Sequence, residues 1–197
     1  IDHCLVGSEM CIRDRYHSMD ATIGQTTNSL WLYAGTGDYE RIGNTSNGTD
    51  NLMIGIRDPH YPEYRDVAVP KKAADLTKCK NTTKDKKGNK CPTSTDTGWY
   101  IKLDKSQKVT AEPTVSSGLV YFPIYQPTSS VNKCSLGDAF ICGVDDECGT
   151  NFSSNLKNLR RGDTCKYVGQ GVLSKIVVFA GKLFANIAGQ SAGSIKD

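Results

Sequence analysis

Two stretches of this chain repeat a pattern that strongly limits its fold: a run of β-branched and aromatic residues, a two-residue turn ending in glycine, and a second such run. In EPTVSSGLVYFPIY the turn is Ser117-Gly118, and in SKIVVFAGKLFANIAG it is Ala180-Gly181. Turns of this kind need positive φ, which glycine adopts freely, and the flanking residue types favour extended strands. The two stretches predict β-hairpins. Because helical periodicity is almost absent elsewhere, we predict an all-β fold.

Four further segments have the character of strands. They are SLWLYAGTGD, NLMIGIRD, GWYIKLD and DAFICGVDDECGTN, and the last predicts a strand over Ala139–Val144 that runs into an acidic turn ending at Gly149. The second strands of the recurring pattern begin near Leu30, Leu119 and Leu183. These spacings exceed one propeller blade of about 40–50 residues unless long insertions or a further blade lie between them. We predict a partial β-propeller with quinoprotein-like blades and long loop insertions, and a β-sandwich is the alternative.

The first fifteen residues are interpreted as foreign to the fold. The eleven residues Leu5–Arg15 read LVGSEMCIRDR, which is the translation of CTC GTG GGC TCG GAG ATG TGT ATA AGA GAC and a following AG-initiated codon. That nucleotide string matches the end of a transposon-type sequencing adapter, and the agreement is too long for chance. The alternative is a redox or metal-binding pair at Cys4 and Cys11. We exclude residues 1–15 from fold reasoning.

Six cysteines remain, and their number and spacing predict disulfides. No C-x-x-C motif and no nearby pair of histidines accompanies them, which favours disulfides over zinc. Cys79 and Cys91 flank a lysine-rich stretch, so we predict that a disulfide between them closes it. The other four cysteines allow three pairings, and the sequence leaves these open: Cys134, Cys142, Cys148 and Cys165. Since disulfides persist in oxidising compartments, we predict an exported protein.

The charge pattern argues against nucleic-acid binding. The net charge is only +3, and eight lysines lie between Lys71 and Lys90. A nucleic-acid-binding face usually interleaves arginine and aromatic residues with its lysines, and this stretch has neither. We predict a solvated loop. A transmembrane helix is not expected either, because the longest apolar run, Ile176–Ala180, is far shorter than the roughly 18–20 residues that cross a bilayer.

Two short motifs are candidates for binding. Asp145, Asp146 and Glu147 form the densest acidic group, and three close carboxylates suit a metal ion, but we favour a turn between strands. The tripeptide Arg161-Gly162-Asp163 spells an integrin-recognition motif in a polar insertion. We keep it as a candidate for surface recognition, with a chance occurrence as the favoured interpretation.

Catalytic motifs are not found. Apart from His3, the chain has only His17 and His60, and no G-x-S-x-G or H-E-x-x-H motif surrounds a nucleophile or metal ligand. We predict that the protein is not an enzyme.

Taken in order, the strand segments resemble the C-terminal β-propeller of the PilC/PilY family of type IV pilus tip-associated proteins. The matching stretches are LWLYAGTGDYE, NLMIGIRD, GWYIKLD, AEPTVSSGLVYFPIYQP, CSLGDAFICGVDDECGTN and CKYVGQGVLSKIVVFAGKLFANIAGQS. The resemblance implies that residues 16–197 are a C-terminal β-propeller fragment of a secreted, fimbrium-associated assembly and adhesion factor. It further implies the periplasm, cell surface or pilus tip of a Gram-negative bacterium as its location.

Partners and cofactors also follow from the resemblance. Minor pilins would bind an upstream region outside this sequence, and the propeller would contact a host or abiotic surface. The family's propeller is associated with a calcium loop of the D-x-[DN]-x-[DN] type, which supplies oxygen ligands at alternate positions. This pattern is absent around the aspartates at 38, 50, 96, 104, 138 and 163. We therefore assign no cofactor or metal ligand to this chain and expect any calcium site upstream.

Two alternatives from other functional classes stay open. The acidic turn suggests a quinoprotein-type propeller oxidoreductase, although two tryptophans, Trp31 and Trp99, are too few for the tryptophan-rich repeats of those enzymes. A carbohydrate-binding propeller is suggested by Tyr121, Phe122 and Tyr125, which we expect instead to lie in the core. The favoured function is a non-enzymatic propeller in type IV pilus assembly and adhesion.

Overall fold

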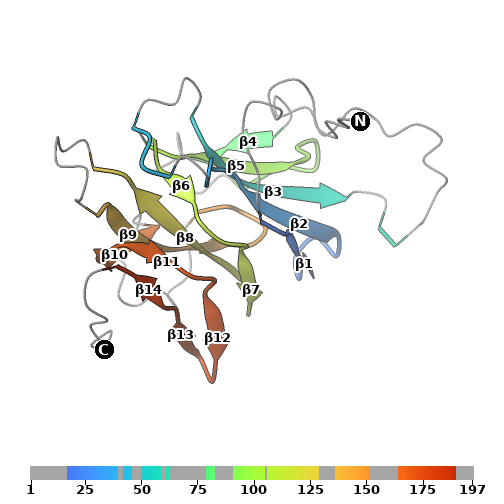
Figure 1. Cartoon of the computed structure of the whole chain (residues 1–197). Coiled ribbons are helices and arrows are strands. Elements are labelled where there is room, and N and C mark those ends of the chain that lie inside the picture. Colours follow the sequence, from blue (N-terminus) through green and yellow to red (C-terminus); the bar gives the residue numbers. More distant parts are fainter. Residues whose placement is uncertain are drawn as a thin grey trace, which may run out of the picture.

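A computed structural model describes residues 17–39, 42–45, 50–58, 61–62, 79–82, 91–104, 106–128, 136–150 and 164–189. Their regular structure is a set of fourteen β-strands arranged in two larger and two smaller sheets (Figure 1). Across these ranges, no helix has the length and apolar character that a membrane span requires. The prediction of an all-β fold is confirmed.

The first sheet has five strands in the order β1-β2-β3-β5-β4. Neighbouring strands are antiparallel except β4 and β5, which run parallel. The segments LWLYAG, LMIGIRD and GWYIK, all predicted as strands, form the centre of this sheet. The bounds are β1 (Asp20–Ile23), β2 (Leu30–Gly35), β3 (Leu52–Asp58), β4 (Cys79–Asn81) and β5 (Gly98–Lys102).

The second sheet is built around β8, which pairs along its length with β9 and at its two ends with β6 and β7. Strand β10 completes this sheet on the other side of β9. The bounds are β6 (Lys108–Val109), β7 (Thr114–Ser116), β8 (Leu119–Gln126), β9 (Asp138–Asp145) and β10 (Cys165–Gln170). Strand β9 extends the predicted strand Ala139–Val144 by one residue at each end.

Two short antiparallel pairs complete the described structure. They are β11 (Val172–Leu173) with β14 (Ile187–Ala188), and β12 (Val177–Phe179) with β13 (Lys182–Phe184). In Figure 1 the β12–β13 hairpin extends away from the two large sheets, with its turn at the far end.

Both predicted hairpins and their turns are confirmed. The φ angles are 52° and 76° at Ser117 and Gly118, and 50° and 74° at Ala180 and Gly181. Positive φ at both central residues is the signature of a type I′ turn, whose twist matches that of the flanking strands. The same local chemistry therefore builds β7–β8 and β12–β13.

The hydrophobic core joins the two large sheets. Side chains on alternate positions of β2 and β8 point to the same side of their strands, which is how a strand buries one face. The cluster combines both sheets and comprises Trp31, Tyr33, Met53, Trp99, Leu103, Val109, Val120, Phe122, Ile124, Cys142 and Val144. The described strands do not close into a barrel.

Candidate functional site

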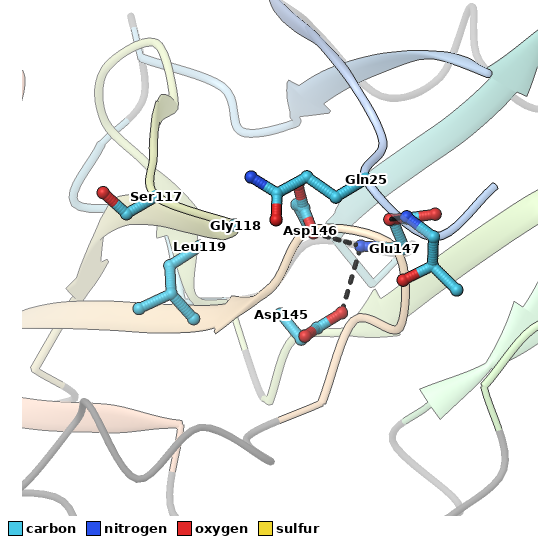
Figure 2. A pocket seen from close by; sticks show the side chains of 8 residues that line it. Gln25, Ser117, Gly118, Leu119, Asp145, Asp146 and Glu147 are labelled. Carbon is cyan, nitrogen blue, oxygen red and sulfur yellow. Dashed lines mark hydrogen bonds between the residues drawn. The ribbon is translucent and has the colours of Figure 1, made fainter. Parts of the chain in front are cut away.

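A pocket of about 220 Å³ lies where three turns meet (Figure 2). Gln25 and Thr26 come from the turn between β1 and β2, and Ser117 and Gly118 come from the β7–β8 turn. The acidic residues predicted as a turn line the rest, with Leu119: Asp145, Asp146 and Glu147. This pocket is a candidate site because it gathers polar groups from distant parts of the chain.

The carboxylates of Asp145 and Asp146 are used to build the turn. Asp145 Oδ1 accepts hydrogen bonds from the backbone amides of Glu147 (3.1 Å) and Cys148 (2.9 Å). Asp146 Oδ1 accepts from the same Glu147 amide at 2.9 Å. The Gly149 amide donates to the Asp145 carbonyl, and Gly149 itself has a φ of 67°. Aspartate side chains commonly replace backbone partners in this way. The prediction of an acidic turn ending at Gly149 is confirmed.

Glu147 connects this turn to the other sheet. Its two carboxylate oxygens accept hydrogen bonds from the amides of Thr26 (2.6 Å) and Thr27 (2.8 Å), 121 and 120 residues away in the chain. The Thr27 hydroxyl in turn accepts a hydrogen bond from Trp31 Nε1 at 2.9 Å. Hydrogen bonds to a charged acceptor are stronger than neutral ones. Glu147 therefore fastens the β1–β2 turn to the end of β9.

The three carboxyl groups differ in their pKa values. Burial raises the pKa of Asp145 to about 6, and the neighbouring Asp146 adds to the shift. Burial and the charge of Glu147 raise the pKa of Asp146. Burial also disfavours the ionised form of Glu147, but the hydrogen bonds from Thr27 and Thr26 outweigh it and leave the pKa below its ordinary value. As the pH falls, Glu147 therefore keeps its negative charge longer than the two aspartates do.

The acidic side chains serve as hydrogen-bond acceptors within the fold. Within the described ranges, no three or more His, Cys, Asp or Glu side chains are placed to hold a metal ion together. The oxygens identified above already accept hydrogen bonds from backbone amides. The acidic group therefore acts as a structural junction between turns.

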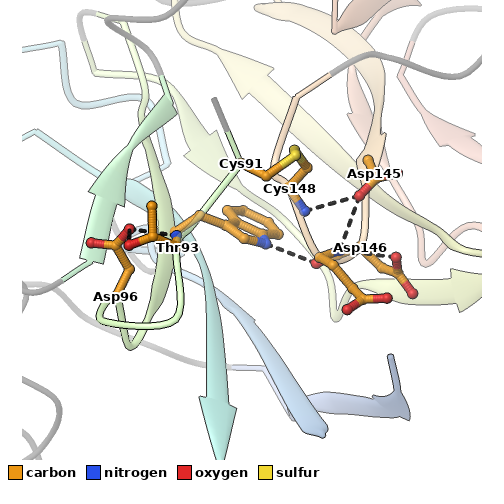
Figure 3. Close-up of a disulfide and its surroundings, with 8 residues drawn as sticks. Cys91, Thr93, Asp96, Asp145, Asp146 and Cys148 are labelled. Carbon is orange, nitrogen blue, oxygen red and sulfur yellow. Dashed lines mark hydrogen bonds between the residues drawn. A yellow bond between two sulfur atoms is a disulfide. The ribbon is translucent and has the colours of Figure 1, made fainter. Parts of the chain in front are cut away.

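A disulfide and a buried tryptophan are both linked to the same acidic turn (Figure 3). Cys91 is bonded to Cys148, 57 residues away, with their Cα atoms 4.5 Å apart. Trp99 is fully buried, and its Nε1 donates to the Asp146 carbonyl at 2.8 Å. A Cβ atom on Gly55 or on Gly149 would lie 2.4 Å from the Trp99 ring. The ring therefore packs against two glycines. Gly55 lies in β3 of the first sheet, and Gly149 lies in the turn that follows β9.

The predicted disulfide between Cys79 and Cys91 is wrong, because Cys91 pairs with Cys148. Closeness in sequence suggested the prediction, but β4 runs parallel to β5 and carries Cys79 to a position beside Gly98. There the Cys79 sulfur is buried and lies 3.4 Å from Thr97 Oγ1. Cys91 instead reaches the turn that follows β9.

A second disulfide joins Cys142 and Cys165, which lie directly opposite each other on β9 and β10. This is one pairing among those that the sequence left open. Cys134 lies outside the described residues, and so do Arg161, Gly162 and Asp163. Their roles as a disulfide partner and as a surface-recognition motif stay predictions.

The aromatic residues considered for carbohydrate binding are mostly in the core. Phe122 and Tyr125 are buried, and the Tyr125 hydroxyl accepts a hydrogen bond from the Gly137 amide at 3.1 Å. Tyr121 is half-buried. Their expected core position is confirmed for Phe122 and Tyr125. The histidine at position 17 is half-buried with its ring edge-on to Tyr39, and position 60 lies outside the described residues.

One buried charged residue was not anticipated from the sequence. The Lys108 side chain is fully buried, and its Nζ donates to the backbone carbonyls of Asn44 (2.8 Å) and Ser106 (3.3 Å). Burial lowers the pKa of Lys108. A lysine in a short strand carries no local sign of burial, and its partner Asn44 lies 64 residues away in the chain, so only the folded structure reveals this role.

Comparisons with known proteins give a structural likeness. No protein-family profile matches the chain, and no curated protein matches it. Among solved structures, it is similar to the C-terminal domain of Pseudomonas aeruginosa PilY1, with a TM-score of 0.55 and 10% sequence identity. The match covers 89% of this chain and 43% of the PilY1 chain, so this chain spans less than half the length of that structure. At this identity the likeness shows a shared fold.

Proposed function

We propose that this chain forms part of a non-enzymatic β-propeller in an exported protein that acts in type IV pilus assembly and adhesion. The observation that carries the proposal is the structural likeness to the PilY1 C-terminal domain over 89% of the chain. The ordered strand segments that resemble the PilC/PilY family are a second line of support, from the sequence. Fold alone does not establish function, so the proposal combines both lines of support.

The chemistry of the described residues agrees with export and with a structural role. Of the two disulfides, Cys142–Cys165 joins β9 to β10 within the second sheet, and Cys91–Cys148 joins the segment before β5 to the turn after β9. Such bonds persist in oxidising compartments. The carboxylates of the candidate pocket serve backbone amides. In this proposal the partners are pilus components, with minor pilins bound through a region outside this sequence, and a host or abiotic surface.

The propeller part of the proposal concerns a longer polypeptide. Strands at the edge of a sheet expose unpaired backbone groups, and a propeller limits such edges by repeating its blades around a ring. The PilY1 structure contains more than twice the length that this chain matches. We propose that the strands described here belong to such a larger ring, with any calcium site outside them.

A deletion experiment tests the pilus role. Removing the gene should reduce surface pili and twitching motility, and the intact gene supplied in trans should restore both. A gene carrying Trp99→Ala, which opens the core beneath the acidic turn, should restore neither. A gene carrying Ile23→Thr, a change at an exposed β1 position, serves as the matched control. Unchanged piliation and twitching in the deletion strain would contradict the proposal.

The non-enzymatic part is tested separately. Purified protein supplied with a quinone cofactor and an artificial electron acceptor should not reduce the acceptor above the rate of the cofactor alone. Sustained, cofactor-dependent dye reduction would favour the alternative of a propeller oxidoreductase.

A further inference from the structure

The β12–β13 hairpin presents the most exposed apolar side chain of the described residues. Phe179 is 71% exposed, and Val177 and Phe184 are 52% and 50% exposed. Single exposed apolar residues are common on protein surfaces, but several gathered on one element indicate a contact surface. These three residues lie within eight positions of the chain.

The strand register places the three side chains on one face. Val177 lies opposite Phe184, and Phe179 lies opposite Lys182. Cross-strand partners and alternate residues of a strand share a face, so all four side chains project from the same side of the hairpin. Val178 and Leu183 project from the other side and are half-buried. The hairpin is apolar on both faces, and only the face with Phe179 is open to solvent.

The base of the hairpin is firmly attached to the body. Ile176, immediately before β12, is completely buried, and its carbonyl accepts a hydrogen bond from Thr114 Oγ1 at 2.6 Å. Lys175 forms an ion pair with Glu112. From this base the hairpin extends away from the two large sheets, and its type I′ turn lies at the far end (Figure 1). The exposed face is therefore held in a defined, projecting position.

The segment that contains the hairpin has lysines but no acidic residues. From Thr164 to Gly189 the chain has three lysines and no aspartate or glutamate. Lys182 lies on the exposed face itself, beside Phe179. Two acidic residues lie on the neighbouring elements near the base. Glu112 is paired with Lys175, and Asp20 accepts a hydrogen bond from the Val115 amide at 2.9 Å.

We propose that the β12–β13 hairpin docks on a lipid bilayer that carries anionic headgroups. Phe179 and Phe184 enter the boundary between headgroups and acyl chains, and the Lys182 ammonium stays at the level of the phosphates. Apolar insertion and attraction of lysines to anionic lipid are the two contributions that hold peripheral elements on membranes. A long lysine side chain can bury its methylene stem while its charge remains in water. This binding requires no membrane-spanning segment.

The projecting shape favours a bilayer over a protein partner. A tip raised above its surroundings can enter a soft, flat surface without contact from the rest of the molecule. Protein interfaces of ordinary affinity bury about 800 Å² on each partner, so a protein partner would need contacts beyond the few apolar side chains of this tip. The proposal goes beyond the pilus-associated role and places the Phe179 face on the outside of the larger ring.

Vesicle sedimentation with the purified full chain tests this proposal. Vesicles of phosphatidylcholine alone are compared with vesicles in which about a quarter of the lipid is phosphatidylglycerol, at low ionic strength so that lysine–lipid attraction is weakly screened. We expect binding to the anionic vesicles. Phe179→Ser should weaken it at least about tenfold, since a buried phenyl group contributes that much to partitioning. Lys182→Gln should weaken it about fivefold on anionic vesicles only.

The matched control is Ile23→Thr, which removes an apolar side chain that is 47% exposed from β1 in the first large sheet. It should bind as the unchanged chain does. Failure of the unchanged chain to sediment with anionic vesicles would overturn the proposal, as would full binding by Phe179→Ser. If Phe179→Ser instead abolishes self-association measured by light scattering without any vesicle binding, the face is a protein interface and the lipid proposal is wrong.

Discussion

The hairpins β7–β8 and β12–β13 share a turn type but differ in what covers them. Each has a two-residue turn with positive φ at both positions. In the first, β8 pairs with three other strands and buries Phe122 against both sheets. In the second, β12 and β13 pair with each other, and Phe179 is exposed. The turn specifies that a hairpin forms, whereas neighbouring strands and layers decide how much it contributes to stability.

Truncating the two phenylalanines should show the largest difference. Phe122→Ala is expected to lower the free energy of unfolding by about 3–5 kcal/mol, because it removes buried contacts and leaves a cavity. Phe179→Ala should change it by less than about 0.5 kcal/mol, since its side chain already contacts water. Urea denaturation followed by tryptophan fluorescence measures both values. Equal losses for the two variants would break the comparison.

Removing the disulfide between β9 and β10 should come next. The double variant Cys142→Ala, Cys165→Ala opens a loop of 23 residues, for which the chain-entropy relation gives a loss of about 3 kcal/mol. Because the bond lies in the sheet that contains β8, amide hydrogen exchange should accelerate in β8 and β9. Exchange in β12 and β13 should change little. Acceleration confined to β12–β13 would contradict the placement of this disulfide in the larger cooperative unit.

Alanine at the two turn glycines gives a matched pair of smaller perturbations. Gly118 and Gly181 have φ angles of 76° and 74°, and a Cβ atom at either position would meet no atom within 4 Å. Both changes should therefore introduce only backbone strain, about 1 kcal/mol in each case. Gly118→Ala should appear in global unfolding. Gly181→Ala should appear mainly as faster local hydrogen exchange, and an equal effect on global unfolding would show that β12–β13 folds cooperatively with the core.

The smallest expected difference between the two hairpins is in how pH changes the free energy of unfolding. Asp145 lies opposite Leu119, the first residue of β8, and its pKa is raised to about 6, mainly by burial. The folded state thus holds this proton more tightly than the unfolded state, whose aspartates titrate near 4. The stability from this protonation is complete below about pH 4 and is lost as the pH rises through about 6.

Asp145→Asn keeps an oxygen acceptor for the Glu147 and Cys148 amides but does not titrate. The variant should therefore flatten the decline in stability between about pH 4 and pH 6. Lys182→Gln, on the hairpin that has no acidic residue, should leave the pH profile unchanged. Denaturation midpoints of both variants are measured across this pH range. If the midpoints of Asp145→Asn follow the same pH curve as those of the unchanged chain, Asp145 is not the source of the decline.

The local features of the fold were predictable from short stretches of sequence. Alternating β-branched and aromatic residues around Ser117-Gly118 and Ala180-Gly181 predicted both hairpins, because turn geometry depends on the φ preferences of two residues. The acidic turn after β9 was predicted for a similar reason, since Asp145 satisfies amides only two and three positions away. The all-β class followed from the same short-range signals.

Features that depend on distant parts of the chain were not predictable in this way. The partner of Cys91 is Cys148 because the strand arrangement brings the end of β9 to it, and the nearer Cys79 is carried away along β5. Glu147 binds amides more than a hundred residues away. The Cys91–Cys148 disulfide and the Glu147 hydrogen bonds form only after the two sheets pack.

From its sequence alone this chain is predicted to be a β protein with two hairpins whose turns need positive φ, and it has an even number of cysteines outside its first fifteen residues. These properties depend on neighbouring residues and on composition. The packing of the sheets decided which cysteines pair, why Lys108 is buried against carbonyls, and why Phe122 is covered while Phe179 is exposed. The physical reason is that burial and bonding between distant residues depend on which surfaces meet, and that is a property of the whole folded chain.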